Sequence, residues 1–221
     1  VDGLIIATAA RDDLLVARCI AQHVPFVLVN RGADAEGLSM VVNDDQLGTQ
    51  LAVQHLVALG HRRIAHLAGP QNLSTGFVRR AGFVAAMREA GLPAGSIVNC
   101  AGYSREAGKS GCEKLFAKAP DITAIVASND LLALGCYDAL HAMNLSCPEN
   151  ISVIGHNDMP LMDMVSPPMT TVRIQHREMG AQAALVLLEN IASPDRAPEA
   201  VVLQPAIILR KSTAQPRPAG K

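Results

Sequence analysis

Polar side chains suited to binding hydroxyl and carboxylate groups follow most of the strand-like runs of this sequence. In a parallel α/β sheet a ligand binds at the carboxyl ends of the strands, where loops and helix N-termini meet. Asparagine offers a donor and an acceptor, arginine offers a planar pair of donors, and tyrosine offers a flat ring. The pattern therefore predicts a site for a hydroxylated or carboxylated small molecule. The polar residues at predicted strand ends are Thr8, Asn30, Arg31, Thr75, Arg79, Tyr103, Asn129, Asp130, His156, Asn157 and Asp158.

Three of these side chains have a structural alternative. Asp130 either caps a helix that begins at Leu131 or contacts the ligand, and capping is the favoured interpretation. Arg79 lies early in its helix, where a cation interacts poorly with the helix dipole, so ligand contact is favoured over a structural role. Tyr103 either stacks on the ligand or simply packs.

Motifs for catalysis and metal binding are missing from the sequence. It has no GxSxG nucleophile turn, no GxxxxGK[ST] phosphate loop and no GxGxxG dinucleotide turn. His55, His61 and His66 are expected on a helix, just after it and in a strand, so they are not expected to share a metal ion. The five scattered cysteines lack CxxC spacing and are expected to be reduced, buried thiols. We therefore expect no enzyme activity, no cofactor and no metal.

The charge balance argues against nucleic-acid binding by this chain alone. Lys and Arg total 19 against 20 for Asp and Glu, a net charge of -1, which lacks the basic excess that phosphate neutralisation requires.

The 221 residues, 49% of them hydrophobic, are enough to bury a core. The apolar runs are strand-sized and no signal peptide opens the chain, which starts without Met inside a strand-like pattern. We expect a cytoplasmic protein that lacks residues at its front.

Strand-like apolar runs alternate with helix-like patterns, which predicts an α/β fold with helices covering parallel sheets. The helix over 45–59 carries Leu47, Leu51 and Leu56 on one side and ends at Gly60. Ser104 is expected to cap a further helix. Predicted strands cover 4–8, 26–29, 40–42, 63–68, 97–100, 124–127, 151–155, 200–203 and 206–209, and other predicted helices end at 23 or cover 78–90, 131–142 and 177–191.

Extended segments near Met40 and over Pro167 to Val172 predict that the chain crosses between two Rossmann-like lobes more than once. We assign residues 1–42 and 172–193 to the first lobe, which is expected to be incomplete at its N-terminus. Residues 43–171 and 194–213 are assigned to the second lobe. The tail at 214–221 contains Pro, Gly and Lys and is expected to be flexible.

Seven segments in a fixed order resemble the effector-binding core of the LacI/GalR family of bacterial transcription regulators. That core shares its two-lobed fold with type I periplasmic sugar-binding proteins, and the resemblance spans nearly the whole chain. Any one segment would be a weak match, whereas seven in order are a strong one. The segments are Val1 to Ile6, His55 to Ala65, Gly69-Pro70 with Arg79 and Gly82-Phe83, Asn129 to Gly135, Pro148 to Gly155, Pro167 to Val172 and Arg210 to Thr213.

The resemblance implies a sensor for a small sugar-like or sugar-acid molecule, bound in the cleft between the lobes. It also implies that this domain forms the homodimer of a repressor. The repressor reaches operator DNA only through an N-terminal helix-turn-helix head, which is absent here. The implied effector contacts are Asn30, Thr75, Arg79, Tyr103, Asn129 and Asn157.

Asn30 and Asn157 depart from this family pattern, which often has aspartate at both positions. With two carboxylates replaced and Arg79 retained, we expect a sugar acid or small carboxylate to bind ahead of a neutral sugar. Arg79→Ala is then expected to weaken binding by about 2–5 kcal/mol with folding nearly unchanged.

The implied mechanism is allosteric: the ligand stabilises one arrangement of the lobes, with a coupling free energy of about 1–3 kcal/mol. A periplasmic sugar-binding protein of an uptake system is the alternative interpretation. The free cysteines and the ending Arg210 to Thr213 count against that alternative. An enzyme on the same architecture is a remote third.

Overall fold

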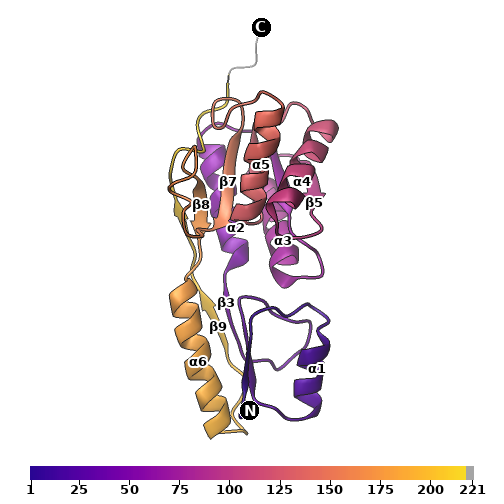
Figure 1. Cartoon of the computed structure of the whole chain (residues 1–221), viewed down its shortest axis with the longest axis vertical. Helices are drawn as coiled ribbons and strands as arrows, with labels where there is room; N and C mark the ends of the chain where they lie inside the picture. Colours follow the sequence, from indigo (N-terminus) through magenta and orange to yellow (C-terminus); the bar gives the residue numbers. More distant parts are fainter. Residues whose placement is uncertain (218–221) are drawn as a thin grey trace. The chain divides into compact units, whose positions relative to one another are not determined.

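The chain divides into two compact units in a computed structural model that describes residues 1–217. Unit 1 comprises Val1–Asp44, Asn72–Thr75 and Gln175–Gln204. Unit 2 comprises Asp45–Gln71, Gly76–Ile174 and the chain from Pro205 onward. Each unit has its own sheet with helices packed on it (Figure 1). The predicted α/β fold with parallel sheets is confirmed.

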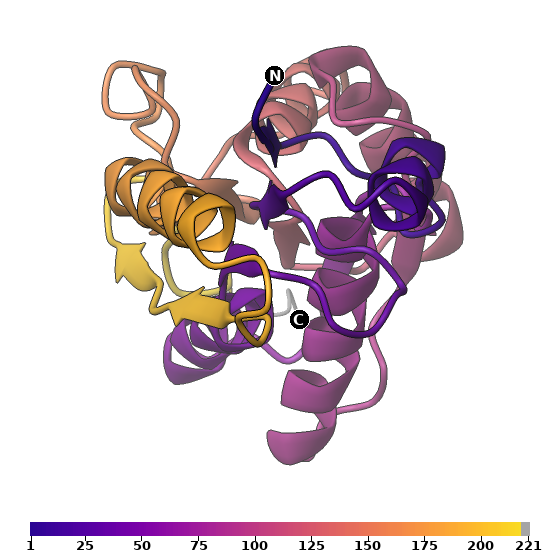
Figure 2. The same cartoon turned by 90° about the horizontal axis from the view of Figure 1, so that it is seen from below.

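Unit 1 is built on a four-stranded parallel sheet with strand order β1-β2-β3-β9. Helices α1 and α6 lie on opposite faces of this sheet (Figures 1 and 2). Asp13 caps α1 by accepting hydrogen bonds from two backbone N–H groups, and α6 buries a stripe at helical spacing, Met179, Ala183 and Val186. The elements of unit 1 are β1 (Leu4–Ile6), α1 (Leu14–Ala21), β2 (Phe26–Val29), β3 (Met40–Asn43), α6 (His176–Ala192) and β9 (Ala200–Leu203).

Unit 2 is built on a six-stranded sheet with strand order β10-β8-β7-β6-β4-β5, parallel except for the edge strand β10. The elements contained in unit 2 are α2 (Asp45–Ala58), β4 (Ile64–Ala68), β5 (Ile97–Asn99), α4 (Arg105–Lys118), β6 (Ala124–Ala127), α5 (Asp130–Ala142), β7 (Ser152–Asn157), β8 (Thr170–Arg173) and β10 (Ala206–Ile208). Helix α3 (Ser74–Glu89) begins with two residues of unit 1 and continues in unit 2.

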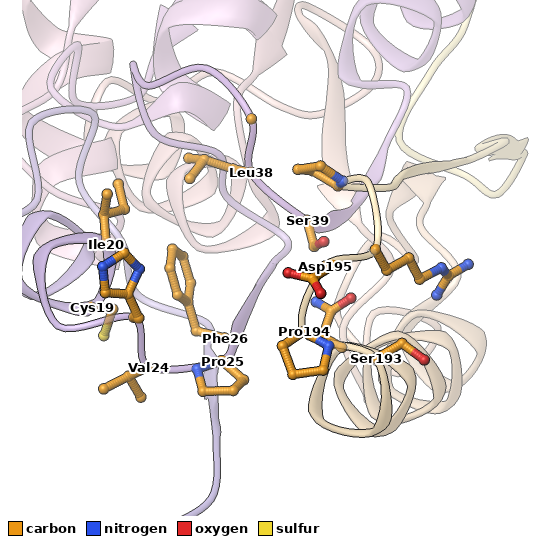
Figure 3. Close-up of a pocket in the computed structure, with 15 residues that line it drawn as sticks. Cys19, Ile20, Val24, Pro25, Phe26, Leu38, Ser39, Ser193, Pro194 and Asp195 are labelled. Atoms are coloured by element: carbon orange, nitrogen blue, oxygen red, sulfur yellow. The ribbon is translucent and has the colours of Figure 1, made fainter.

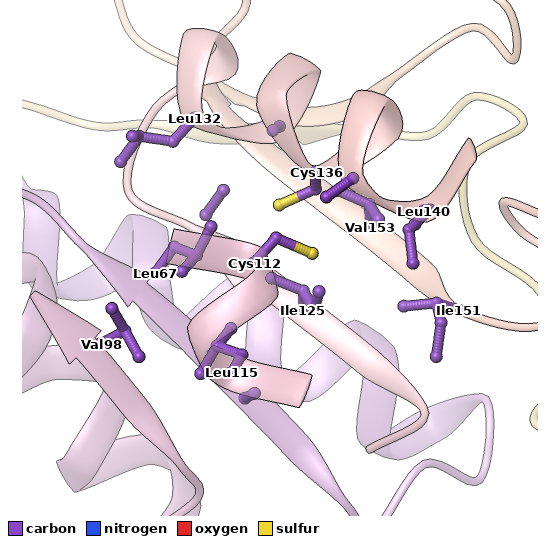
Figure 4. Close-up of a cluster of buried hydrophobic side chains, with 14 of the residues drawn as sticks. Leu67, Val98, Cys112, Leu115, Ile125, Leu132, Cys136, Leu140, Ile151 and Val153 are labelled. Carbon is purple, nitrogen blue, oxygen red and sulfur yellow. The ribbon is translucent and has the colours of Figure 1, made fainter. Parts of the chain in front are cut away.

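Alternate residues of the central strands face two separate cores, as the two-residue period of a strand requires. In β6, Ala124 and Val126 pack with side chains of α2 and α3, whereas Ile125 and Ala127 pack with side chains of α4 and α5. Figure 4 shows the second of these cores, where Leu115 and Cys136 approach the sheet from the two helices. Burial on both faces explains why these strands read as continuous apolar runs.

Helices α4 and α5 cross at two glycines. A Cβ atom on Gly135 would lie 2.2 Å from the carbonyl oxygen of Arg105, and one on Gly108 would lie 2.3 Å from that of Leu132. Only a residue without a side chain allows the two backbones to approach this closely. The contact fixes the N-terminal half of α5, which begins directly after the predicted site residue Asn129.

Two sequence-based assignments near the C-terminus are wrong. The assignment of 194–213 to the second lobe is wrong for residues 194–204, which belong to unit 1, where β9 pairs with β3. The predicted crossing over Pro167 to Val172 includes the first three residues of β8, which pairs with β7, and the chain changes unit only after Ile174.

Part of the predicted flexible tail is anchored. The backbone N–H of Ala214 donates to Ser152 Oγ at 3.0 Å, and the carbonyl of Ala214 lies 2.9 Å from His61 Nε2. Residues 218–221 of that tail lie outside the described residues. Within residues 1–217, no helix combines the length and the apolar character needed to cross a membrane.

Candidate functional site

Arg79 is buried in the second turn of α3, and its guanidinium group is already paired. Its side chain contacts Asp45 through Nε and Nη2, each 2.8 Å from Asp45 Oδ1. Its Nη1 donates to the carbonyl of Ser128 at 2.6 Å and to Asn157 Oδ1 at 3.3 Å. Arg79 is 2% exposed. The guanidinium group therefore ties together α2, the end of β6 and the end of β7.

This geometry corrects two expectations about Arg79. Its charge is balanced by a buried carboxylate, so the argument that the site is positive, and hence prefers an anion, loses its premise. An unpaired carboxylate would remain after Arg79→Ala, so folding is not expected to be unchanged. Sequence reasoning missed Asp45, which closely follows the strand predicted over 40–42, because it precedes Arg79 by 34 residues and no local pattern shows that the two side chains pair.

Asp45 stays ionised inside the protein. Burial alone raises the pKa of a carboxyl group, but here the charge of Arg79 and the contact with His156 outweigh it and lower the pKa of Asp45 below its usual range. His156 Nε2 lies 3.5 Å from Asp45 Oδ1 and makes no hydrogen bond within residues 1–217. The pair of Arg79 and Asp45 is thus a buried ion pair with a histidine beside it.

Two histidines near this pair are buried and neutral. Burial, with Arg79 adding to it, lowers the pKa of His156 to about 4. Burial lowers the pKa of His66 to about 3, and its ring stacks on Phe83 with centroids 4.8 Å apart. His66 Nδ1 donates to the carbonyl of Val126 at 2.8 Å. Among the described residues, no group of three or more His, Cys, Asp or Glu is placed to hold a metal ion.

These histidines give the protein a predicted pH dependence. Their folded pKa values lie below the ordinary 6.5, so below pH 6.5 the unfolded state takes up protons that the folded state does not. The free energy of unfolding should fall as the pH is lowered from 6.5 towards 4, by about 1.4 kcal/mol per pH unit for each histidine. Urea unfolding at pH 7, 6 and 5 measures this slope.

Asp130 opposes the histidines in the same range. Burial raises its pKa to about 6, so its contribution to stability is present at low pH and is lost as the pH rises from 3.8 through 6. Asp130→Asn should therefore make the fall in stability below pH 6 steeper. A slope that is flat in wild type, or unchanged in Asp130→Asn, would contradict these assignments.

The cap of α5 is Asn129 and not Asp130, which corrects the sequence interpretation. Asn129 has an extended backbone, and its Oδ1 accepts a hydrogen bond from Leu132 N at 2.8 Å. Asp130 is fully buried; its two carboxylate oxygens accept from Thr171 Oγ1 at 2.6 Å and Met159 N at 2.7 Å. The Asn129 amide is thus fixed at the carboxyl end of β6.

Asn157 and Asn30 both adopt a backbone conformation with positive φ, 111° and 64° respectively. Asparagine tolerates this region better than most residues. The backbone therefore explains the residue type at both positions without any ligand, which sequence reasoning did not detect. Asn157 ends β7, and its Oδ1 accepts from Arg79 as described above; Asn30 directly follows β2 in unit 1.

Tyr103 and Thr75 complete the predicted set. Tyr103 follows β5 and lies over Gly69, where a Cβ atom would come within 2.2 Å of the phenol oxygen. Thr75 is buried in the first turn of α3 and belongs to unit 1 by its contacts. The structure thus places Tyr103, Asn129 and Asn157 at the carboxyl edge of the unit 2 sheet, with Arg79 against the ends of β6 and β7. Asn30 and Thr75 lie in unit 1.

Asp158 does not supply a free charge at this edge either. It forms ion pairs with Arg173 at 2.6 Å and with Arg210 at 2.8 Å, and its side chain is only 6% exposed. Neither arginine was a predicted site residue. Arg173 is the last residue of β8 and Arg210 follows β10. Their residue type alone does not distinguish them from surface arginines.

A cavity of about 400 Å³ lies elsewhere, in unit 1. Phe26 lies on one side of it and Pro194 and Asp195 on the other (Figure 3). Its walls include Pro25 and Ser39, which precede β2 and β3, so it opens at the amino ends of these strands. None of the predicted site residues lines it, and parallel sheets bind ligands at the opposite edge.

Comparison with known proteins agrees with the fold. Residues 53–213 match a protein family described as periplasmic binding protein-like domain. The chain is 32% identical over 215 residues to the HTH-type transcriptional regulator CelR of Thermobifida fusca, covering 96% of this chain and 63% of that protein. It is 35% identical over 202 residues to the HTH-type transcriptional regulator MalR of Streptomyces coelicolor, covering 89% and 58%. The chain spans 56% to 64% of the length of such relatives.

Solved structures of similar proteins include sugar complexes. A transcriptional regulator CelR–cellobiose complex has a TM-score of 0.91 and 31% identity, covering 96% of this chain and 66% of that one. A LacI family transcriptional regulator from Enterococcus faecium with bound ribose has a TM-score of 0.85 and 30% identity, covering 97% and 80%.

Proposed function

Because this chain belongs to the LacI family of transcriptional regulators, as its effector-binding domain, we propose that it binds a small sugar-like effector at the carboxyl edge of the six-stranded sheet. The observation that carries the proposal is that two amides are fixed at the ends of neighbouring strands. Asn129 is held by the α5 cap and Asn157 by Arg79. Groups held in place before binding lose little conformational entropy when a ligand arrives. Asn30, Thr75 and Tyr103 remain predicted contacts.

The experiment that tests this proposal replaces one amide without removing the helix cap. Asn129→Ser should keep the cap, because serine is also a good N-cap residue, but it loses the amide donor. For an aldose or disaccharide that binds wild type, we expect about a tenfold loss of affinity, the size of one hydrogen bond of about 1.4 kcal/mol. Isothermal titration calorimetry with a panel that includes cellobiose and ribose measures it.

Asn150→Ser is the matched control. The Asn150 side chain accepts a hydrogen bond from Ser146 N, and Asn150 lies just before the amino end of β7, away from the carboxyl ends of the strands. Its affinity should equal that of wild type, and both variants should melt near the wild-type temperature. Failure of the whole panel to bind wild type, or equal affinity in wild type and Asn129→Ser, would contradict the proposed site.

The proposal extends to regulation of transcription, by analogy with the HTH-type relatives. The effector favours one of two conformations of the domain, and the resulting change reaches operator DNA through a DNA-binding head. With a net charge of -1, the chain alone should not shift operator DNA at physiological salt. Sugar uptake is not favoured, because the relatives are regulators.

We also propose that the domain acts as a homodimer, the symmetry that palindromic operators favour. Leu161 and Met164 lie on one turn of unit 2, since Met164 N donates to the carbonyl of Leu161, and their side chains are 63% and 76% exposed. An exposed apolar turn of this kind suits a dimer contact. Met164→Glu should raise the dimer dissociation constant about tenfold or more, because a charge would have to be buried.

Sedimentation velocity across a range of concentrations measures the dissociation constant. Val84→Glu serves as a control, since Val84 is 37% exposed on α3 and away from this turn in the sequence. A chain that is monomeric at every concentration up to tens of micromolar would contradict the dimer, and equal effects of the two variants would contradict the contact surface.

A further inference from the structure

Arg79 is the one arginine or lysine that is buried among residues 1–217, and it lies beside the proposed effector site. Its Nη1 is 3.3 Å from the Asn157 amide oxygen, so its charge is adjacent to a proposed ligand contact. A buried cation at this position would attract carboxylates strongly unless a counter-charge were present.

Asp45 is that counter-charge. It is the first residue of α2 and of unit 2, and its Oδ1 meets both Nε and Nη2 of Arg79. The other described partners of Arg79 are the carbonyl of Ser128 and the amide of Asn157, which carry no charge. Removing the Asp45 carboxylate would therefore leave the Arg79 charge without an anion in contact with it.

The other buried carboxylates at this edge form no ion pair with Arg79 among the described residues. Asp158 is paired with Arg173 and Arg210. Asp130 accepts from the Thr171 hydroxyl and the Met159 N–H. Each has partners of its own, and Asp45 is the carboxylate that contacts Arg79 directly.

We propose that Asp45 is a specificity-determining residue: by fixing and neutralising Arg79, it makes the effector site select neutral, hydroxyl-rich ligands over their carboxylate counterparts. The inference rests on the proposed function, because it concerns the same edge of the sheet. Asp45 acts through Arg79 and is a positioning residue, with no contact to the ligand required.

The test compares a sugar with its own acid. Cellobiose is titrated against cellobionate, and ribose against ribonate, at pH 7.5 by calorimetry. Wild type should prefer the neutral member of the pair that it binds. Asp45→Asn should shift the ratio of the two affinities about tenfold towards the acid, because a charge without its partner now lies within a few ångströms of the ligand. Loss of packing alone would weaken both ligands and leave the ratio unchanged.

Asp138→Asn is the matched control, since Asp138 pairs with Arg105 towards the C-terminal half of α5, where the arginine is 56% and the aspartate 34% exposed. Its ratio should equal that of wild type. Arg79→Gln should shift the ratio away from the acid, and the double variant Asp45→Asn with Arg79→Gln should restore it. These two variants decide the matter if Asp45→Asn fails to fold.

The outcomes separate the two claims. Wild type that prefers the acid, or variants whose ratios do not follow the sign of the charge change, would overturn the role of Asp45 while leaving sugar binding in place. Wild type that binds neither member of either pair would count against the proposed function, and the inference would fall with it.

Discussion

Replacing Arg79 by alanine should lower the free energy of unfolding by about 3–5 kcal/mol. The change leaves the Asp45 carboxylate buried without its cation, and it removes donors from the Ser128 carbonyl and the Asn157 amide. A buried charge without its partner is costly because neither water nor another ion solvates it. Urea unfolding at pH 7.5, followed by circular dichroism, measures the difference.

Arg105→Ala provides the control for this prediction. Arg105 also pairs with an aspartate, but the side chains of Arg105 and Asp138 are 56% and 34% exposed. An exposed pair is typically worth about 0–1 kcal/mol, so the variant should be nearly as stable as wild type. If Arg79→Ala proved as mild as Arg105→Ala while effector binding was lost, the structural role of Arg79 would be wrong and direct ligand contact would be favoured.

Gly135→Ala should be the second severe change, with a loss of about 3 kcal/mol in the free energy of unfolding. The added methyl group would lie 2.2 Å from the Arg105 carbonyl and 2.4 Å from the Lys109 nitrogen. Both are backbone atoms of α4, so the clash is relieved only if the two helices move apart. Because α5 carries Asn129 at its cap, effector affinity should fall along with stability.

Gly180→Ala tests whether this loss comes from the helix contact. Gly180 lies in α6, and apart from its chain neighbours and the nearby backbone of that helix, no atom of residues 1–217 lies within 4 Å of an added Cβ. Alanine is the better helix former by about 1 kcal/mol, so this variant should be more stable than wild type. Thermal melts of both variants decide the point, and a Gly135→Ala protein as stable as Gly180→Ala would contradict the close packing of α4 on α5.

The layer architecture follows from the sequence because burial on both faces leaves a clear pattern. Strands β2 and β6 have the predicted bounds, since each is a short apolar run between polar or glycine-containing loops. The sequence pattern does not show which strand an edge strand will pair with. Residues 200–203 and 206–208 look alike and are separated by only two residues, yet they join sheets in different units. The propensity of a strand does not specify which neighbour it will have.

The start of α3 shows a different limit. The helix begins at Ser74, four residues before the prediction, because Gly76 in its first turn reads as a loop residue. The structure explains that glycine: a Cβ atom there would lie 2.1 Å from the Pro70 carbonyl oxygen. Close backbone approaches of this kind depend on tertiary structure and cannot be read from local pattern.

The rule that ligands bind at strand ends found Asn129 and Asn157, which the structure places at neighbouring strand ends. It did not find Asp45, Ser128 or the capping role of Asn129, because these depend on contacts between residues far apart in the sequence. The same omission led to the expectation of an anionic effector. Counting charges along a chain does not show which of them are paired.

Hydrogen–deuterium exchange with and without a bound sugar tests the central claim most directly, because it locates the effector site. With saturating ligand, exchange should slow in the segments that follow β6 and β7, residues 128–132 and 157–162, where Asn129 and Asn157 hold their fixed amides. Slowing confined to residues 19–26 and 190–198, around the cavity of unit 1, would contradict the account.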